Sequence, residues 1–252
     1  MEFIEACLMN PEAADGDFKQ RLSFLQRTGV QNLIFSDFFG LRNFSRKVGD
    51  LKAPIGCLNV ISRPGIEWIE MLWDIINCYD VFSIFIKHNG SVSDDEFKDA
   101  LYRCFSLTDN VGCAMETKTL SSFAFDDIVR TLRDEFNVKH FLILDSEGLL
   151  QPKETLRCLK TLRSRVSGGS KIFYFPNNQH KLGIVNALHA MRLEIDGLAG
   201  SVLKGRCKDP EVVNFIDLYL LYQQKRDDLF SKSSSKVLDH AFKALMRGAE
   251  EE

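Results

Sequence analysis

The chain has 252 residues, of which 45% are hydrophobic and 27% charged, as in a globular protein that can bury a large core. Its net charge of −3, from 32 basic and 35 acidic residues, lacks the basic excess of a general nucleic-acid binder. Seven scattered cysteines without a C-x-x-C pair argue against a disulfide framework and a structural zinc site, and they favour a reducing compartment.

The first residues, "MEFIEACLMNPEAADGDF", have no basic start and only a short apolar run, so we expect no signal peptide. No segment reaches the roughly 18 consecutive apolar residues that a membrane span needs. These features predict a soluble, cytoplasmic protein without nucleic-acid or membrane partners.

Apolar, strand-like runs alternate with helical segments along the chain. Eight strand-like runs are expected near 2–8, 32–38, 54–61, 81–87, 111–117, 140–146, 171–177 and 195–203. Helices are expected at 17–28, 65–78, 93–105, 125–136, 152–166, 181–192 and 210–222. Ser93 is placed as an N-cap and Pro152 as the first residue of its helix.

Eight β/α units without a domain-sized break predict an α/β protein with one (β/α)8 TIM barrel. The alternative is a doubly wound open sheet, which usually has a glycine-rich G-x-G-x-x-G turn after its first strand. The stretch "CLMNPEAADGDF" does not have that form, so the barrel is preferred.

After Tyr222 the pattern is interrupted by "QQKRDDLFSKSSSK" and resumes as "VLDHAFKALMRGAEEE". The three serines beside lysines predict a flexible joint, and the last segment predicts an amphipathic helix. We therefore expect a barrel over residues 1–224 and a C-terminal helical extension over 225–252. The extension is interpreted as packed on the barrel flank, with a dimer contact or a lid as alternatives.

In a (β/α)8 barrel, chemistry gathers at the C-terminal ends of the strands. The polar residues expected there are Asn10, Asp37, Asn59, Lys87, Glu116, Lys118, Asp145, Ser146, Asn177, Asn178, His180, Lys204 and Arg206.

One of these ends, "FLILDSEGLLQP", resembles the D-T-x-G-x-x-x-P signature of the metal-dependent carbon–carbon lyase and Claisen-condensing barrels. This superfamily includes hydroxymethylglutaryl-CoA lyase, isopropylmalate synthase, 4-hydroxy-2-oxovalerate aldolase and the pyruvate carboxylase transferase domain. Asp145, Ser146, Gly148 and Pro152 stand at the motif positions. Downstream, "LGIVNALHAMRLEIDGLAGSV" is similar to the family's next conserved run, and "NVGCAMETK" is similar to its fifth strand.

The resemblance implies a divalent metal held by an H-x-H-N-D motif at strand seven, but those positions hold Phe175, Asn177, Asn178 and Gln179. In the first strand, where the family has an arginine and a metal-binding acid, this chain has Met9 and Asn10. Neutral amides and phenylalanine do not hold a hard divalent ion tightly. We therefore expect the family metal to be lost, and we expect no cofactor.

Three hypotheses for function follow. In a repurposed carbon–carbon lyase or aldolase, a strand-end cation would polarise a 2-oxo acid or acyl thioester, either as a Schiff base or by stabilising an enolate. The expected catalytic residues are Glu116, Lys87, Lys118 and His180, with Glu116 or His180 as the base. The expected substrate-binding residues are Asn10, Asp145, Ser146, Asn177, Asn178, Lys204 and Arg206.

The second hypothesis is a non-catalytic barrel that keeps the pocket and binds a small carboxylic acid or a partner. The third is an assembly subunit that uses the C-terminal helix. A homo-oligomer is compatible with each hypothesis.

Overall fold

The structure is a computed structural model of the whole chain. It describes residues 1–6, 15–30, 32–35, 38–48, 57–62, 72, 82–88, 94–117, 119, 125–166, 169–203 and 211–249.

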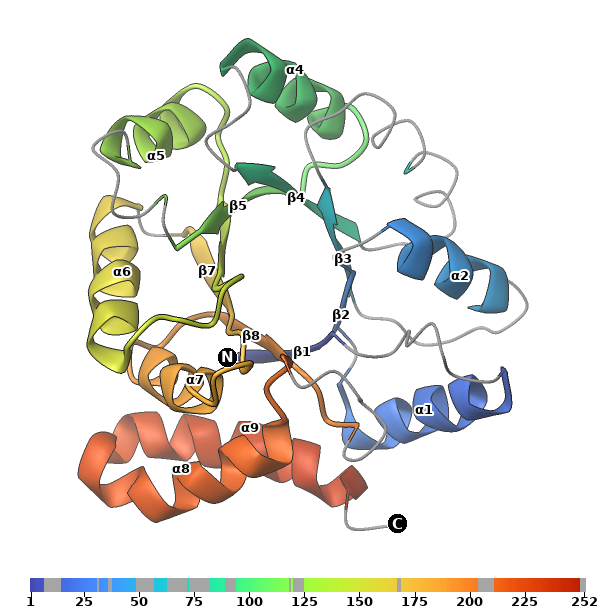
Figure 1. Cartoon of the computed structure of the whole chain (residues 1–252), viewed down its shortest axis with the longest axis vertical. Coiled ribbons are helices and arrows are strands. Elements are labelled where there is room, and N and C mark those ends of the chain that lie inside the picture. Colours follow the sequence, from blue (N-terminus) through green and yellow to red (C-terminus); the bar gives the residue numbers. More distant parts are fainter. Residues whose placement is uncertain are drawn as a thin grey trace.

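A closed barrel of eight parallel strands forms the centre of the molecule (Figure 1). The strands are β1 (Glu2–Glu5), β2 (Asn32–Phe35), β3 (Cys57–Ser62), β4 (Phe82–His88), β5 (Val111–Glu116), β6 (His140–Leu144), β7 (Lys171–Phe175) and β8 (Gly197–Gly200). Each strand pairs with its sequence neighbours, and β1 closes the ring on β8 with Glu2 opposite Gly197. The predicted (β/α)8 barrel is confirmed.

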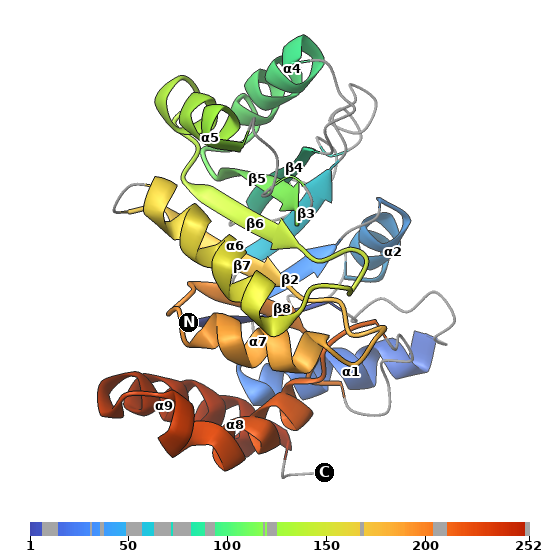
Figure 2. The same cartoon turned by 60° about the vertical axis from the view of Figure 1, so that its left-hand side comes forward.

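Helices surround the barrel between successive strands (Figures 1 and 2). They are α1 (Asp15–Thr28), α2 (Phe38–Val48), α4 (Asp94–Phe105), α5 (Phe125–Asp134), α6 (Pro152–Arg165), α7 (Gly183–Met191), α8 (Phe215–Leu229) and α9 (Lys232–Ala249). The sequence pattern did not include α2. The expected helix 65–78 lies outside the described residues apart from buried Leu72, and Ser93 also lies outside them.

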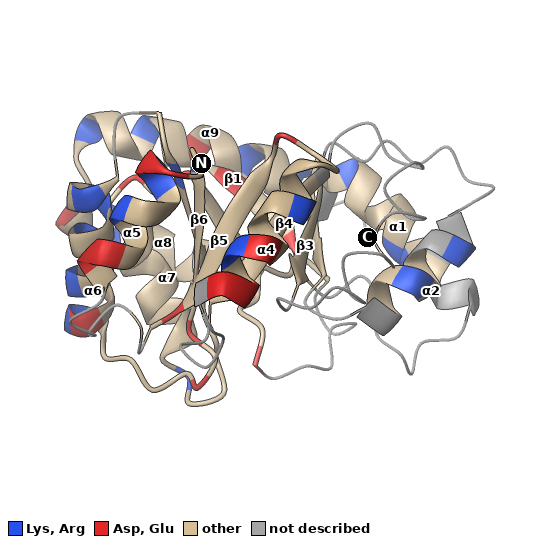
Figure 3. Ribbon diagram, turned by 90° about the horizontal axis from the view of Figure 1, so that it is seen from above, with Lys and Arg blue, Asp and Glu red and all other residues tan. Residues whose placement is uncertain are grey.

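The predicted start of α6 at Pro152 is confirmed, because proline has no N–H to leave unpaired in the first turn. Glu154 closes the turn by accepting a hydrogen bond from the backbone N–H of Gln151 at 2.9 Å. Acidic and basic positions are interspersed over α5 and α6 on the outer surface (Figure 3).

The barrel interior is filled with apolar side chains. This inner core consists of Ile4, Ile34, Ile61, Phe85, Ala114, Leu142, Leu144, Phe173 and Ala199. Phe85 and Phe173 meet edge to face with ring centroids 5.6 Å apart. The alternate strand residues, such as Tyr174 and Leu198, belong to the larger core that packs against the helices. Because the lumen is packed, space for a ligand is left to the ends of the strands.

The C-terminal helices α8 and α9 form a hairpin on the outside of the barrel, beside α7 and α1 (Figures 1 and 2). On α9, the Phe242 ring lies 5.0 Å from that of Phe3 on β1. Helix α8 runs through position 224, where the boundary between barrel and extension was expected.

The predicted flexible joint at the serines is wrong. Ser233, Ser234 and Ser235 lie in the first turn of α9, and only Phe230 and Ser231 separate the two helices. The Ser231 hydroxyl accepts a hydrogen bond from the Ser234 backbone N–H at 3.2 Å, which is the geometry of a helix N-cap. A serine cluster therefore starts this helix instead of interrupting it.

In the part of the chain that the structure describes, no helix is long and apolar enough to cross a membrane.

Candidate functional site

A cavity of about 300 Å³ opens at the C-terminal ends of β3, β4, β6 and β7. Its described lining residues are Ile61, Ser62, Lys87, Leu144, Asp145, Ser146, Phe175, Pro176, Asn177, Glu211 and Val212. The cavity lies above the packed lumen, where loops of a barrel of this type build binding sites.

Lys87 and Glu116 form an ion pair at the mouth of the barrel. The Lys87 Nζ lies 2.6 Å from Glu116 Oε1, and the two side chains are 28% and 11% exposed. Lys87 stands near the end of β4 and Glu116 ends the neighbouring strand β5, so parallel pairing brings them together. Ser146, from the turn after β6, places its hydroxyl 3.5 Å from the same carboxylate oxygen. Three predicted site residues therefore meet at one point.

Asp145 follows β6 and is buried, with 2% of its surface exposed. Burial raises the pKa of its carboxyl to about 6, against the opposing hydrogen bond from the Gly148 N–H. That bond ends on Oδ1 at 3.2 Å. The Tyr174 hydroxyl also interacts with this carboxyl, but no contact to Oδ2 has full hydrogen-bond geometry among the described residues. Asp145 is therefore an acid that can exchange a proton near neutral pH.

Asn177 connects three loops at the edge of the cavity. Its amide nitrogen donates to the Ser146 carbonyl at 3.0 Å and to Glu211 Oε2 at 3.3 Å. Its amide oxygen accepts from the Gln179 backbone N–H at 2.8 Å. The side chain of a predicted substrate-binding residue is thus occupied by the protein itself, and it fixes the cavity wall.

Two glycines make room for Asn177. Gly148 has a φ of +64°, and a Cβ there would stand 2.8 Å from Asn177 Oδ1. A Cβ on Gly183 would stand 2.5 Å from the Asn177 carbonyl oxygen. Gly148, the glycine of the D-T-x-G-like motif, is therefore needed in this chain because a side chain there would clash with Asn177.

Asn178 and His180 lie outside the residues that line the cavity. The Asn178 side-chain oxygen accepts from the Ile184 backbone N–H at 3.3 Å, at the start of α7. His180 is exposed. Four further predicted site residues lie outside the described part of the chain: Asn10, Lys118, Lys204 and Arg206.

Sequence reasoning missed Glu211, Ser62 and Glu5. Glu211 lines the cavity from the segment before α8; this segment was expected to begin a helix over 210–222, but α8 starts only at Phe215. Ser62 ends β3 and also lines the cavity. Glu5 is buried in β1 and accepts from the Val202 backbone N–H at 2.9 Å. Glu5 is an acid within an apolar strand, and because burying such a group is costly, that pattern could have marked it.

The described donors do not fit the divalent metal of the resembled family. By the resemblance Phe175 stands at a metal-ligand position, and its ring offers no donor atom; the nitrogen and the oxygen of the Asn177 side-chain amide are both engaged by the protein. Among the described residues, no three His, Cys, Asp or Glu side chains gather as a metal site requires. The loss of the family metal stays a prediction, and no chemical step is assigned to a metal here.

Solved structures share the fold of this chain at low sequence identity. The N-terminal domain of a candidate aldolase from Bacteroides vulgatus superposes with a TM-score of 0.64 and 12% identity, covering 100% of this chain and 93% of that chain. The carboxyl transferase domain of Rhizobium etli pyruvate carboxylase, solved with pyruvate and biocytin, gives a TM-score of 0.70 and 9% identity.

The second comparison covers 98% of this chain but 47% of the pyruvate carboxylase chain, so this protein spans about half of that length. No protein-family profile matches the chain, and no curated protein matches it. At these identities the likeness establishes the barrel fold alone.

Proposed function

We propose that this protein is an atypical carbon–carbon lyase or aldolase-like enzyme of the resembled superfamily, acting on a 2-oxo acid or acyl thioester without the family metal. The observation that carries the proposal is the Lys87–Glu116 pair, whose 2.6 Å contact stands at the strand ends where this fold places its chemistry. The shared fold and the motif around Asp145 support the same lineage.

The ion pair favours a charged Lys87 over a Schiff-base lysine. In this pair Lys87 acts through its charge, whereas formation of a Schiff base would first require its contact with Glu116 to break. The ammonium group binds the 2-oxo oxygen, where negative charge develops as an enolate forms. Lys87 thus polarises the 2-oxo group, as a Lewis acid does in other enolate-forming enzymes.

Glu116 is the proposed base. It removes a proton from the carbon next to the 2-oxo group, and the electron pair of that C–H bond forms the enolate double bond while the carbonyl oxygen becomes negative. Cleavage of a 4-hydroxy-2-oxo acid follows the same course, with the hydroxyl proton passing to Glu116 and the carbon–carbon bond electrons forming the enolate. Ser146, 3.5 Å from the carboxylate, orients it.

Exchange of the methyl protons of pyruvate in D2O, followed by proton NMR, tests this proposal. We expect the wild-type chain to catalyse exchange, and Lys87→Met and Glu116→Gln to lower the rate at least about 100-fold. Lys160→Met, at an exposed lysine of α6, is the matched control and should leave exchange unchanged. Absence of exchange with pyruvate, larger 2-oxo acids and acyl thioesters would contradict the catalytic proposal.

Borohydride trapping separates the two forms of lysine chemistry. We expect no covalent adduct, because Lys87 acts as a cation. An adduct mapped to Lys87 would show that this lysine forms a Schiff base, and the electrostatic role proposed for it would be wrong.

The second candidate is a barrel that binds a small carboxylic acid without turnover. The nitrogen and the oxygen of the Asn177 side-chain amide are both hydrogen-bonded within the protein, so this side chain has little capacity left to bind a substrate. This observation favours the second candidate. Calorimetric binding of pyruvate that depends on Lys87, together with absence of proton exchange, would support this candidate. The predictions of a homo-oligomer and of a cytoplasmic location are retained as part of either candidate.

A further inference from the structure

A second cavity, of about 490 Å³, lies between the C-terminal helices α8 and α9. None of its described lining residues also lines the strand-end cavity. Tyr219, Gln223 and Arg226 line it from α8, and Asp239, Lys243, Met246 and Arg247 line it from α9. We call this cavity the α8–α9 groove.

The described lining residues of the groove carry more positive than negative charge. The one carboxylate among them, Asp239, accepts from the Tyr222 hydroxyl at 2.8 Å and pairs with Arg226 at 2.6 Å. Lys243 and Arg247 follow Asp239 at intervals of four residues, so the three side chains lie along one face of α9. Neither of these two cations has a hydrogen bond or ion pair with any described residue.

Arg226 is already engaged within the protein. Its Nη2 binds Asp239, and its Nε is buried and closed to solvent. Lys243 and Arg247 are exposed, so they are the lining cations that can act on one ligand.

The groove also has apolar surface. Tyr219 packs its ring against Phe242, with centroids 5.3 Å apart, and lines the groove together with Met246. The cavity volume lies within the range of small-molecule sites. Guanidinium and ammonium groups are the usual partners of phosphate oxygens in proteins.

We propose that the α8–α9 groove binds a small organic molecule that carries phosphate. Lys243 and Arg247 hold the phosphate oxygens beside the Arg226–Asp239 pair, and Tyr219 and Met246 contact the organic part. The site is independent of the chemistry at the strand ends.

Calorimetry on the full chain tests the site with three probes: pyrophosphate, ADP and adenosine. We expect ADP to bind more tightly than pyrophosphate, because it adds an apolar contact, and adenosine to bind at least about 100-fold more weakly than ADP, because it lacks phosphate. Added salt should weaken the binding of both phosphates, since the cations are exposed.

The double variant Lys243→Gln with Arg247→Gln should lose at least about tenfold in affinity for ADP and pyrophosphate. Its matched control is Lys225→Gln with Lys236→Gln, which removes the same charge from exposed lysines of the same two helices outside the groove. The control should stay within about twofold of the wild type.

Three results would overturn the proposal: no binding of either phosphate probe by the wild type, equal losses in the two double variants, or adenosine bound as tightly as ADP. Lys243→Arg should keep affinity within about threefold, which separates loss of charge from loss of folding.

Discussion

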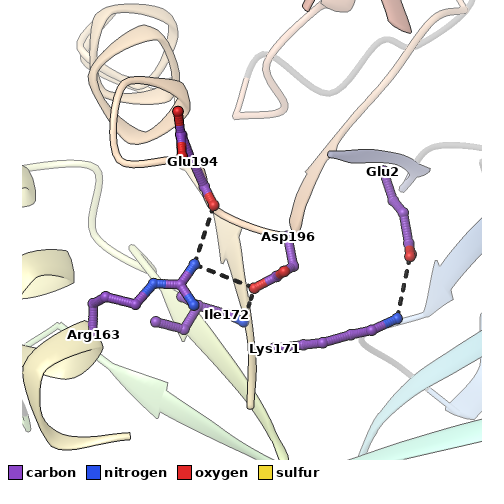
Figure 4. A network of polar contacts seen from close by, with 6 residues as sticks. All are labelled: Glu2, Arg163, Lys171, Ile172, Glu194 and Asp196. Atoms are coloured by element: carbon purple, nitrogen blue, oxygen red, sulfur yellow. Dashed lines mark hydrogen bonds and ion pairs between the residues drawn. The ribbon is translucent and has the colours of Figure 1, made fainter. Parts of the chain in front are cut away.

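At the N-terminal end of the barrel, Lys171 lies 3.3 Å from Glu2, and Arg163 lies 3.3 Å from Asp196 (Figure 4). All four side chains are between 34% and 47% exposed. At the C-terminal end, Lys87 and Glu116 are 2.6 Å apart and only 28% and 11% exposed. Ion pairs of the same kind are therefore solvent-exposed at the N-terminal end of the barrel and largely buried at the C-terminal end.

The difference lies in how completely each carboxylate is satisfied. Asp196 is bonded to Arg163 and also accepts from the Ile172 backbone N–H at 2.8 Å, so it joins β7 to β8 (Figure 4). Asp145, at the opposite end, is buried with one oxygen short of a full hydrogen bond. Satisfied, exposed charge stabilises a barrel modestly, whereas buried and incompletely paired charge costs stability and is suited to chemistry.

The largest expected effect separates the two ends directly. Lys87→Met should reduce pyruvate proton exchange at least about 100-fold, because it removes the cation that stabilises the enolate. Lys171→Met removes a lysine of similar pairing at the other end and should leave exchange within about twofold. Equal losses in the two variants, measured by NMR at matched protein stability, would place the chemistry elsewhere.

A second prediction concerns the turn that shapes the cavity. Gly148→Ala should lower the free energy of unfolding by about 2–3 kcal/mol, because it combines a positive φ with a clash against Asn177. Gly169→Ala, with a φ of +100° but no atom within 4 Å of the new Cβ, isolates the backbone cost. Urea unfolding should find the Gly148 variant less stable than the Gly169 variant, and the reverse order would contradict the packing argument.

The buried carboxyl gives a pH-dependent prediction. The pKa of Asp145 is raised from 3.8 to about 6, so the native state keeps its proton over a range where the unfolded state has lost it. The free energy of unfolding therefore falls as pH rises between these values, and this cost persists above pH 6.

Asp145→Asn should remove this cost and stabilise the protein at pH 7.5 by about 1–2 kcal/mol, after allowance for solvent screening, with the gain shrinking toward pH 4. Asp196→Asn is the control at the other end, where loss of the Arg163 pair should destabilise slightly. Thermal unfolding at several pH values measures both. A stabilisation that does not change with pH would rule out titration of Asp145 as its cause.

The smallest effect is expected from the exposed pairs. Arg163→Met should lower the free energy of unfolding by less than about 1 kcal/mol, because both partners are solvated. Urea unfolding in low and high salt should give a difference from wild type that decreases as salt rises. A larger cost that salt leaves unchanged would mean that packing, not charge, is lost.

Part of the candidate site could be predicted from sequence. Strand ends were found from apolar runs, and since all the strands are parallel, their polar C-terminal residues had to share one end of the barrel. Lys87, Glu116 and Ser146 do meet there. Glu211 was not found in this way, because the sequence placed it in the first turn of a helix over 210–222, whereas α8 starts at Phe215. His180 was expected there from its place after a strand, but the turn leaves it exposed and off the cavity lining.

By itself, the sequence determined the number and order of the strands and most of the helices between them, though not α2, because the alternation of apolar strands and amphipathic helices is a local property of the chain. The start of α6 at Pro152 was equally local. The tertiary structure alone decided which strand-end groups pair, which are buried and which are taken up by other loops. Those outcomes depend on distances across the barrel and on removal from water, as the contrast between Lys87–Glu116 and Lys171–Glu2 shows. Neither quantity is encoded at any one position of the chain.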